Sequence, residues 1–172
     1  MSAVPQTTLL LSPESYRRID REIAKFPAGH KASAVIAALA IAQAQLGWLS
    51  KEAIEEVGHY LEMPAIAVYE VASFYGMYDL ERPGRFKIAI CTNLPCALSG
   101  AGRAAAHLKA KLGIGFGETT ADGTFTLKEG ECLGACGDAP VLLVNNTRMC
   151  SFMNEERLDA LLDELKNGPG QA

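Results

Sequence analysis

Residues 86–96, Phe86-Lys-Ile-Ala-Ile-Cys91-Thr-Asn-Leu-Pro-Cys96, combine the end of a β-strand with two cysteines. Apolar side chains alternate with Lys87 and Ala89 up to Cys91, which is the pattern of a strand that ends at this cysteine. A second pair, Cys132-Leu-Gly-Ala-Cys136, precedes another short apolar run. If the flanking strands are neighbours in one sheet, all four sulfurs meet at one sheet edge. Four thiolates from two loops can hold a single inorganic centre.

The spacing of the two pairs leaves the identity of that centre open. A set of four cysteines without histidine suits an iron–sulfur cluster and excludes a Rieske centre, which needs two histidine ligands. Structural zinc also takes four cysteines, although its ligand pairs usually have two residues between them. Disulfide or redox-active thiol chemistry is the third alternative. A redox dithiol normally has a two-residue spacer, which neither pair shows.

Length, charge and hydropathy exclude several other classes of protein. The 172 residues carry a net charge of −4 with scattered basic residues, which argues against nucleic-acid binding. The longest apolar run, 34–42, is too short to cross a bilayer, and the N-terminus lacks the pattern of a secretory signal. We therefore expect a cytoplasmic protein without a membrane span. In that compartment, clustered cysteines bind metals or catalyse reactions more often than they form disulfides.

Helical patterns dominate the chain up to about residue 78, and short loops between four expected helices predict a small N-terminal four-helix bundle. Ser12 is expected to cap the first helix, which ends at Pro27. Further helices are predicted from Ala32 to Leu46, after a cap at Ser50, and from Pro64. The Pro-Gly pair within 79–85 is the expected boundary between two domains, residues 1–80 and 85–167.

Beyond the boundary, strands and helices alternate, and the chain as a whole is predicted to be α+β. A helix is expected from Ser99 to Leu112, and a hairpin from Thr119 to Leu127 around Asp122-Gly123. A second hairpin is expected around Asn145-Asn146, followed by a helix that Asn154 caps. These elements make a small two-layer unit. Residues 1–8 and 167–172 are expected to be disordered.

Several further residues invite interpretation. Cys150, outside both pairs, is predicted to be a small buried hydrophobic residue. His30, His59 and His107 have no acidic or cysteine neighbour in sequence and are interpreted as surface or core residues. The aromatic residues of the fourth helix are predicted to lie in the bundle core, with contact to a partner subunit as the alternative. They are Tyr69, Phe74, Tyr75 and Tyr78.

Two stretches around the cysteines carry a family resemblance. Cys-Thr-Asn-Leu-Pro-Cys-Ala-Leu at 91–98 and Gly-Glu-Cys-Leu-Gly-Ala-Cys-Gly-Asp-Ala-Pro-Val at 130–141 resemble the thioredoxin-like two-iron ferredoxin family. The chain is similar to those members that serve bacterial NADH:quinone oxidoreductase, respiratory complex I. The likeness extends through Val68-Tyr-Glu-Val-Ala-Ser-Phe-Tyr75 and so covers both expected domains.

The resemblance implies a [2Fe–2S] cluster held by Cys91, Cys96, Cys132 and Cys136, on a thioredoxin-like fold that follows the helical bundle. It also implies a larger flavoprotein partner that binds FMN and NADH, so that this chain carries single electrons within an oxidoreductase of the translocase type. The chain alone is expected to be catalytically silent and, through the complex, peripheral on the inner face of the cell membrane.

Three alternatives remain at this point. The first is the small subunit of a soluble NAD-linked hydrogenase or formate dehydrogenase, which shares the cysteine pattern. The second is a zinc-stabilised interaction module without a redox role. The third is a redox sensor that uses Cys91 and Cys96.

Overall fold

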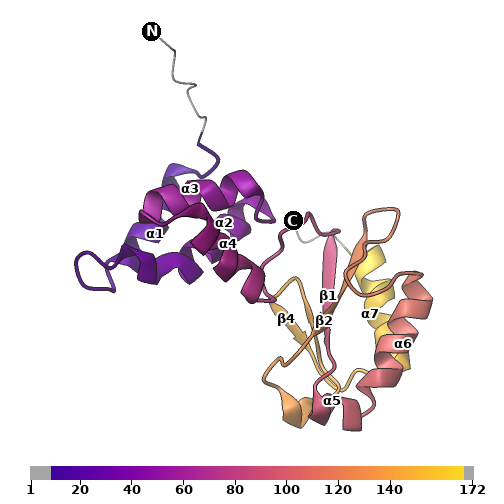
Figure 1. The fold of residues 1–172 in the computed structure, drawn as a ribbon. Helices are drawn as coiled ribbons and strands as arrows, with labels where there is room; N and C mark the ends of the chain where they lie inside the picture. Colours follow the sequence, from indigo (N-terminus) through magenta and orange to yellow (C-terminus); the bar gives the residue numbers. More distant parts are fainter. Residues whose placement is uncertain (1–8, 169–172) are drawn as a thin grey trace. The chain divides into compact units, whose positions relative to one another are not determined.

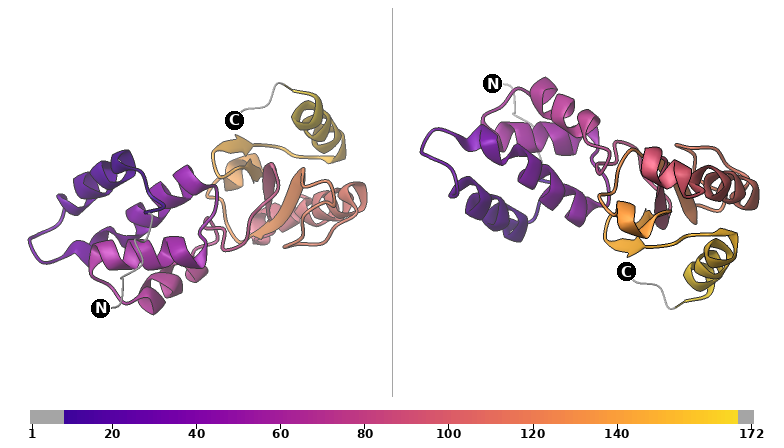
Figure 2. Two further views of the ribbon diagram at one scale, coloured as in Figure 1. Left: turned by 90° about the horizontal axis from the view of Figure 1, so that it is seen from above. Right: turned by 90° about the horizontal axis from the view of Figure 1, so that it is seen from below.

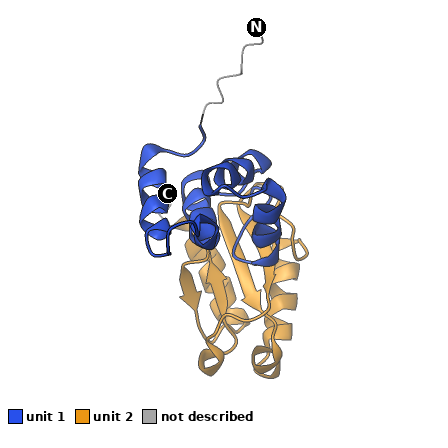
Figure 3. Cartoon of the chain, turned by 60° about the vertical axis from the view of Figure 1, so that its left-hand side comes forward, with its two compact units in different colours: residues 1–82 blue, residues 83–172 orange. Residues whose placement is uncertain are grey.

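The computed structural model describes residues 9–168, and the chain divides into two compact units between Arg82 and Pro83 (Figures 1 and 3). Helices form the described elements of the first unit, whereas the second unit combines helices with one four-stranded sheet. The predicted α+β class is confirmed.

The elements of the first unit are α1 (Pro13–Ile23), the 3-10 helix η1 (Lys31–Ala34), α2 (Val35–Leu46), α3 (Lys51–Leu61) and α4 (Ala65–Phe74). Those of the second unit are β1 (Phe86–Cys91), α5 (Leu94–Leu98), α6 (Ala101–Leu112), β2 (Phe125–Gly130), the 3-10 helix η2 (Cys136–Asp138), β3 (Leu142–Val144), β4 (Arg148–Cys150) and α7 (Glu155–Asn167).

Local capping chemistry fixes the starts of two helices in the first unit. The side chain of Ser12 accepts a hydrogen bond from the Ser15 amide at 3.2 Å, and Ser50 caps α3 in the same way through Ala53. Two expected boundaries were wrong. The first helix ends at Ile23, before Pro27. The segment from Lys31 to Ala34 is a tighter 3-10 turn, because its amides bond three residues back and not four.

The core of the first unit is made of aliphatic side chains from all four α-helices, among them Ile19, Leu39 and Val57. Of the aromatic residues predicted to lie in this core, Tyr78 is buried and donates a hydrogen bond to the Ile36 carbonyl at 2.6 Å. The other three are 47%, 80% and 38% exposed, in the order Tyr69, Phe74 and Tyr75. The prediction was wrong for these three, because Val68 and Ala72 occupy the inner face of α4.

The sheet of the second unit has the strand order β2-β1-β3-β4. Strand β1 pairs in parallel with β2, so that Cys91 lies opposite Gly130, and it pairs antiparallel with β3. Helices α6 and α7 pack against one face of the sheet (Figures 1 and 2). The core between them contains Ile88, Leu127 and Leu158, all 0% exposed.

The chain turns over between Thr119 and Leu127 as predicted, with Gly123 at φ +70°. The Thr120 amide donates to the Phe125 carbonyl at 2.8 Å and the Leu127 amide to the Glu118 carbonyl at 3.1 Å, but the first arm forms only an isolated bridge, from Thr119 to Thr126, and no strand of its own. The strand β2 begins at Phe125 and continues to Gly130, because it pairs in parallel with β1 over this whole range. Because β1 and β2 run parallel, their carboxyl ends lie at the same edge of the sheet.

The second hairpin and the final helix agree with the sequence pattern. Asn145 and Asn146 have φ of 50° and 59° and connect β3 to β4 as a tight antiparallel hairpin. Asn154 caps α7 by accepting a hydrogen bond from the Arg157 amide at 2.9 Å. The expectation of disorder at 1–8 and 169–172 concerns residues outside the described range, whereas Asn167 belongs to α7. Within residues 9–168, no helix has the length and apolar character needed to span a membrane.

Candidate metal centre

The first cysteine pair is held by regular secondary structure. Cys91 is the last residue of β1, and its amide donates to the Val141 carbonyl at 3.0 Å. The chain then turns into α5, which Asn93 caps and which places Cys96 in the middle of a short helix that begins at Leu94. The sequence pattern predicted a loop for this segment, and the helix was missed. Both cysteines are buried, with 2% and 1% exposure.

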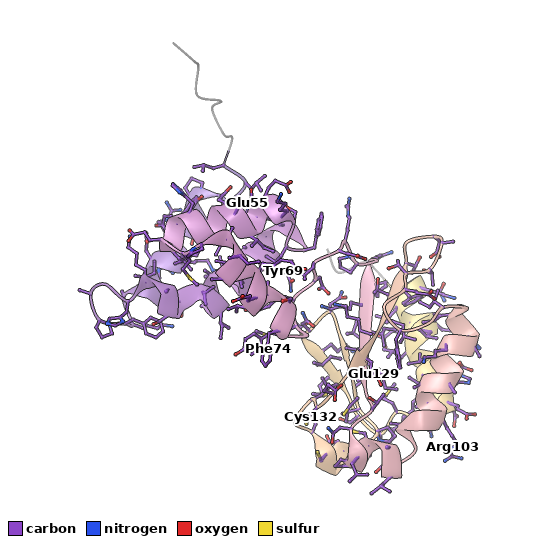
Figure 4. All side chains as sticks on the ribbon, in the orientation of Figure 1. Glu55, Tyr69, Phe74, Arg103, Glu129 and Cys132 are labelled. Carbon is purple, nitrogen blue, oxygen red and sulfur yellow. The ribbon has the colours of Figure 1, made fainter. Side chains whose placement is uncertain are left out.

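The second pair lies in the segment that follows β2. Cys132, which Figure 4 labels, and Cys136 are both exposed, and Cys136 begins the 3-10 turn η2. The far end of this segment is anchored at Asp138, whose carbonyl accepts from the Phe152 amide at 2.8 Å. The Asp138 carboxylate also accepts from the Ser151 hydroxyl at 2.9 Å. These anchors come from residues distant in sequence, so sequence patterns carried no signal for them.

The two cysteine-bearing segments pack on each other at the carboxyl ends of β1 and β2. Cys91, Cys96 and Val141 belong to one small apolar cluster, against which Leu133 and Ala135 of the second segment pack. The Cys91 Sγ lies 3.8 Å from the Glu131 carbonyl oxygen, to which it donates. The structure therefore brings both pairs to one edge of the sheet.

As the side chains stand, one pair of thiols is buried and the other faces outward. Among residues 9–168, no group of three or more His, Cys, Asp or Glu side chains is close enough together to hold a metal ion. The chemistry of the donor set nevertheless fits a thiolate-bound centre. It provides four free thiols on two packed segments.

Cys96 of the buried pair is in a poor environment for an isolated thiolate. Burial raises the pKa of the Cys96 thiol, and the neighbouring Cys91 side chain, which hydrogen-bonds to it, raises it further. A reactive or redox-sensing cysteine needs the opposite environment, with a lowered pKa next to a positive charge. A bound metal centre would supply the positive charge that favours the deprotonated sulfur. The site therefore suits metal binding better than thiol chemistry.

Two other residues considered from the sequence have packing or ion-pair partners. Cys150 packs against the core of the second unit, in agreement with its interpretation as a small hydrophobic residue, and burial raises its pKa. His107 Nε2 lies 2.8 Å from the Asp159 carboxylate, an acidic partner that sequence proximity did not reveal. This pair joins α6 to α7 and lies outside the cysteine segments.

Comparison with known proteins places the chain in a family. A model of the thioredoxin-like [2Fe-2S] ferredoxin family matches residues 19–166. The E subunit of the Rickettsia felis NADH-quinone oxidoreductase is 45% identical over 146 residues, which cover 84% of this chain and 87% of that protein. The mitochondrial NADH dehydrogenase [ubiquinone] flavoprotein 2 of Dictyostelium discoideum is 39% identical, over 90% of this chain and 62% of that protein.

A solved structure with a related fold is an NAD+-reducing [NiFe]-hydrogenase in the air-oxidized state. It aligns with a TM-score of 0.64 and 26% identity, over 74% of this chain but only 22% of the hydrogenase chain. The family match spans both units and includes all four paired cysteines. This chain therefore belongs to the thioredoxin-like [2Fe-2S] ferredoxin family.

Proposed function

We propose that this chain is the small electron-transfer subunit of an NADH:quinone oxidoreductase, respiratory complex I. The observation that carries the proposal is the 45% identity to the E subunit of the Rickettsia felis NADH-quinone oxidoreductase over 84% of this chain. The chain carries one [2Fe–2S] cluster, as its family does. When bound, the cluster supplies a centre that accepts and returns one electron at a time.

The four paired cysteines, Cys91, Cys96, Cys132 and Cys136, are the proposed ligands. The packing of their two segments at one sheet edge supports this assignment. The roles of the two pairs differ. The end of β1 and helix α5 fix Cys91 and Cys96 and exclude water from them, since both are almost fully buried. The segment with the other pair packs against this cluster and is anchored at Asp138.

The partner in this proposal is a larger flavoprotein subunit that binds FMN and NADH, and electrons pass singly between its flavin and this chain. Residues 1–80 then form a four-helix bundle and residues 85–167 the thioredoxin-like domain. The complex places the chain on the cytoplasmic side, peripheral to the inner face of the cell membrane. By itself the chain is expected to have no catalytic activity.

A second candidate is the equivalent module of a soluble NAD-linked hydrogenase or formate dehydrogenase. The TM-score of 0.64 to an NAD+-reducing [NiFe]-hydrogenase favours it. However, the matched segment is 22% of that chain, whereas the Rickettsia protein is matched over 87% of its length. Purification of the native assembly and identification of its companion subunits distinguish the two candidates.

The cluster itself is tested by metal analysis and spectroscopy of the purified chain. We expect iron and acid-labile sulfide in equal amounts, about two of each per chain, with a paramagnetic signal on reduction. Cys96→Ser should abolish or strongly alter this signal, and the matched variant Cys150→Ser should leave it intact. A colourless protein with one zinc, or loss of the signal in Cys150→Ser alone, contradicts the assignment. Reversible thiol oxidation in metal-free protein would support the redox sensor instead.

A further inference from the structure

A hydrogen bond between two side chains joins the strand ends that lead into the cysteine segments. The Thr92 hydroxyl donates to the Glu129 carboxylate at 2.8 Å. Thr92 directly follows Cys91, the last residue of β1. Glu129 is the next-to-last residue of β2 and precedes Cys132 by three residues, and Figure 4 labels both. The bond therefore holds one carboxylate at the sheet edge where both cysteine pairs lie.

The pairing of the two strands does not depend on this bond. The backbone already joins the strand ends, because the Thr92 amide donates to the Gly130 carbonyl at 2.9 Å, directly beyond the last parallel pair of β1 and β2. Glu129 is exposed, and a single hydrogen bond contributes only modestly to the free energy of unfolding. The bond does restrict the carboxylate, since an exposed glutamate side chain otherwise exchanges among several rotamers in water.

The charge of this carboxylate is not neutralised by a neighbour. Within residues 9–168, no lysine or arginine forms an ion pair with Glu129. The other acidic side chains at the site differ from it. Asp138 accepts a hydrogen bond from Ser151, and the carbonyl of Ser151 accepts one from the Arg157 guanidinium at 3.2 Å, which brings a positive charge close to Asp138. Glu131 is exposed, and no other described residue holds its carboxylate. Among the described acidic residues of the site, Glu129 is therefore the one that is both held in place and without a cation.

We propose that Glu129 lowers the reduction potential of the [2Fe–2S] cluster through its charge, and that Thr92 is the positioning residue that holds this charge at the site. The inference rests on the proposed function, which assigns the cluster to the four paired cysteines. Reduction adds one electron, and no bond in this chain forms or breaks. The held carboxylate repels the added negative charge, and net charge is one of the factors that set the potential of such a cluster.

The test is a redox titration of the full-length, cluster-loaded chain with titanium(III) citrate, a strong one-electron reductant, followed by the paramagnetic signal of the reduced cluster. Glu129→Gln keeps an oxygen that accepts from Thr92 but removes the charge. At a fixed ambient potential, the ratio of reduced to oxidised cluster should rise roughly fourfold, the effect of one partly screened surface charge. For a one-electron couple this corresponds to a potential about 35 mV higher. The shift should shrink at high salt, because mobile ions screen the charge.

Further variants separate the charge of Glu129 from its shape. Glu129→Asp keeps the charge and should change the ratio by less than about 1.5-fold. Thr92→Val removes the hydroxyl, so that the carboxylate can turn away, and the ratio should rise roughly twofold. Thr92→Val combined with Glu129→Gln should match Glu129→Gln alone, because the hydroxyl has no charge left to hold. The control Asp163→Asn removes a negative charge from an exposed position of α7 and should change the ratio by less than about 1.5-fold. All variants should keep the iron content and the line shape of the native signal.

The outcomes separate the role of Glu129 from the function on which it rests. A native or lower potential in Glu129→Gln, or an equal shift in Asp163→Asn, overturns that role. An equal shift in Glu129→Asp overturns it as well, since shape and not charge then sets the potential. A native potential in Thr92→Val overturns the role of Thr92, and it overturns the whole proposal if Glu129→Gln does not retain its cluster. If the native chain binds no iron or shows no paramagnetic signal on reduction, the proposed function itself fails.

Discussion

Val141 offers the sharpest test of how the apolar cluster beneath the candidate metal centre is built. Its side chain is 1% exposed and packs with Cys91 and Cys96. Val141→Ala deletes two methyl groups, worth about 0.8 kcal/mol each in transfer free energy. The cavity that remains adds to this, so the local cost is about 2 kcal/mol. That energy corresponds to a roughly 30-fold larger population of the opened site.

The assay follows bleaching of the visible absorbance by an excess of iron chelator. If opening and closing of the site are fast, the bleaching rate tracks the opened population, and it should rise roughly 30-fold in Val141→Ala. The matched control is Val57→Ala, the same deletion at a residue 0% exposed in the core of the first unit. Its effect should appear in the urea midpoint of Trp48 fluorescence, the single tryptophan.

Local support of the cysteines by Val141 is refuted if Val57→Ala accelerates bleaching as much as Val141→Ala does. It is also refuted if Val141→Ala bleaches at the native rate. In the first case, cluster loss reports general unfolding and not opening of the site. In the second, the valine does not support the cysteines.

Three further predictions concern the two units separately. Asp20 accepts a hydrogen bond from the Tyr60 hydroxyl. This bond is the main reason why the pKa of Tyr60 is raised from 10.0 to about 12. This bond stabilises the fold fully below pH 10.0 and its contribution is lost as pH rises through about 12, so in Asp20→Asn one phenol should titrate nearer 10 by ultraviolet absorbance. Asn154→Ala should cost about 1 kcal/mol in urea unfolding through the lost cap of α7, whereas replacement by Asp should be tolerated. Gly84→Ala should cost about 2 kcal/mol, because the new Cβ would lie 2.9 Å from a backbone oxygen; Gly102→Ala, with nothing within 4 Å, should be neutral or stabilising.

The features that could be predicted from the sequence are those that neighbouring residues determine. The caps at Ser50 and Asn154 depend on a side chain that reaches an amide three residues away. The hairpin at Asn145-Asn146 depends on residues that tolerate positive φ. The strand that ends at Cys91 follows from simple alternation. In each case the physical cause lies within a few residues.

The features that could not be predicted depend on contacts between distant segments. The parallel pairing of β1 with β2 sets Cys91 opposite Gly130, and no local pattern encodes which strand becomes the neighbour. The same holds for the bond between His107 and Asp159 and for the anchor of Asp138 on Ser151. Exposure of the aromatic residues was misjudged for a related reason. Periodicity identifies a face of α4, but packing decides which face is covered.

The asymmetry of the cysteine site follows from this division between local and distant causes. Cys91 and Cys96 lie on a strand end and a short helix, the latter capped by the adjacent Asn93, and both are already buried. Cys132 and Cys136 lie on a segment whose place depends on distant anchors: the Thr92 amide bonds the Gly130 carbonyl before the pair, and the residues after β4 bond Asp138 beyond it. A site assembled this way has one rigid half and one half that tertiary contacts hold in place. Removal of a distant anchor, as in Ser151→Ala, deletes the one hydrogen bond that the Ser151 hydroxyl donates to Asp138. It should therefore accelerate loss of the cluster to a chelator several-fold, without changing the number of irons bound. A variant that bleaches at the native rate would show that the segment is held by its own sulfurs and not by the fold.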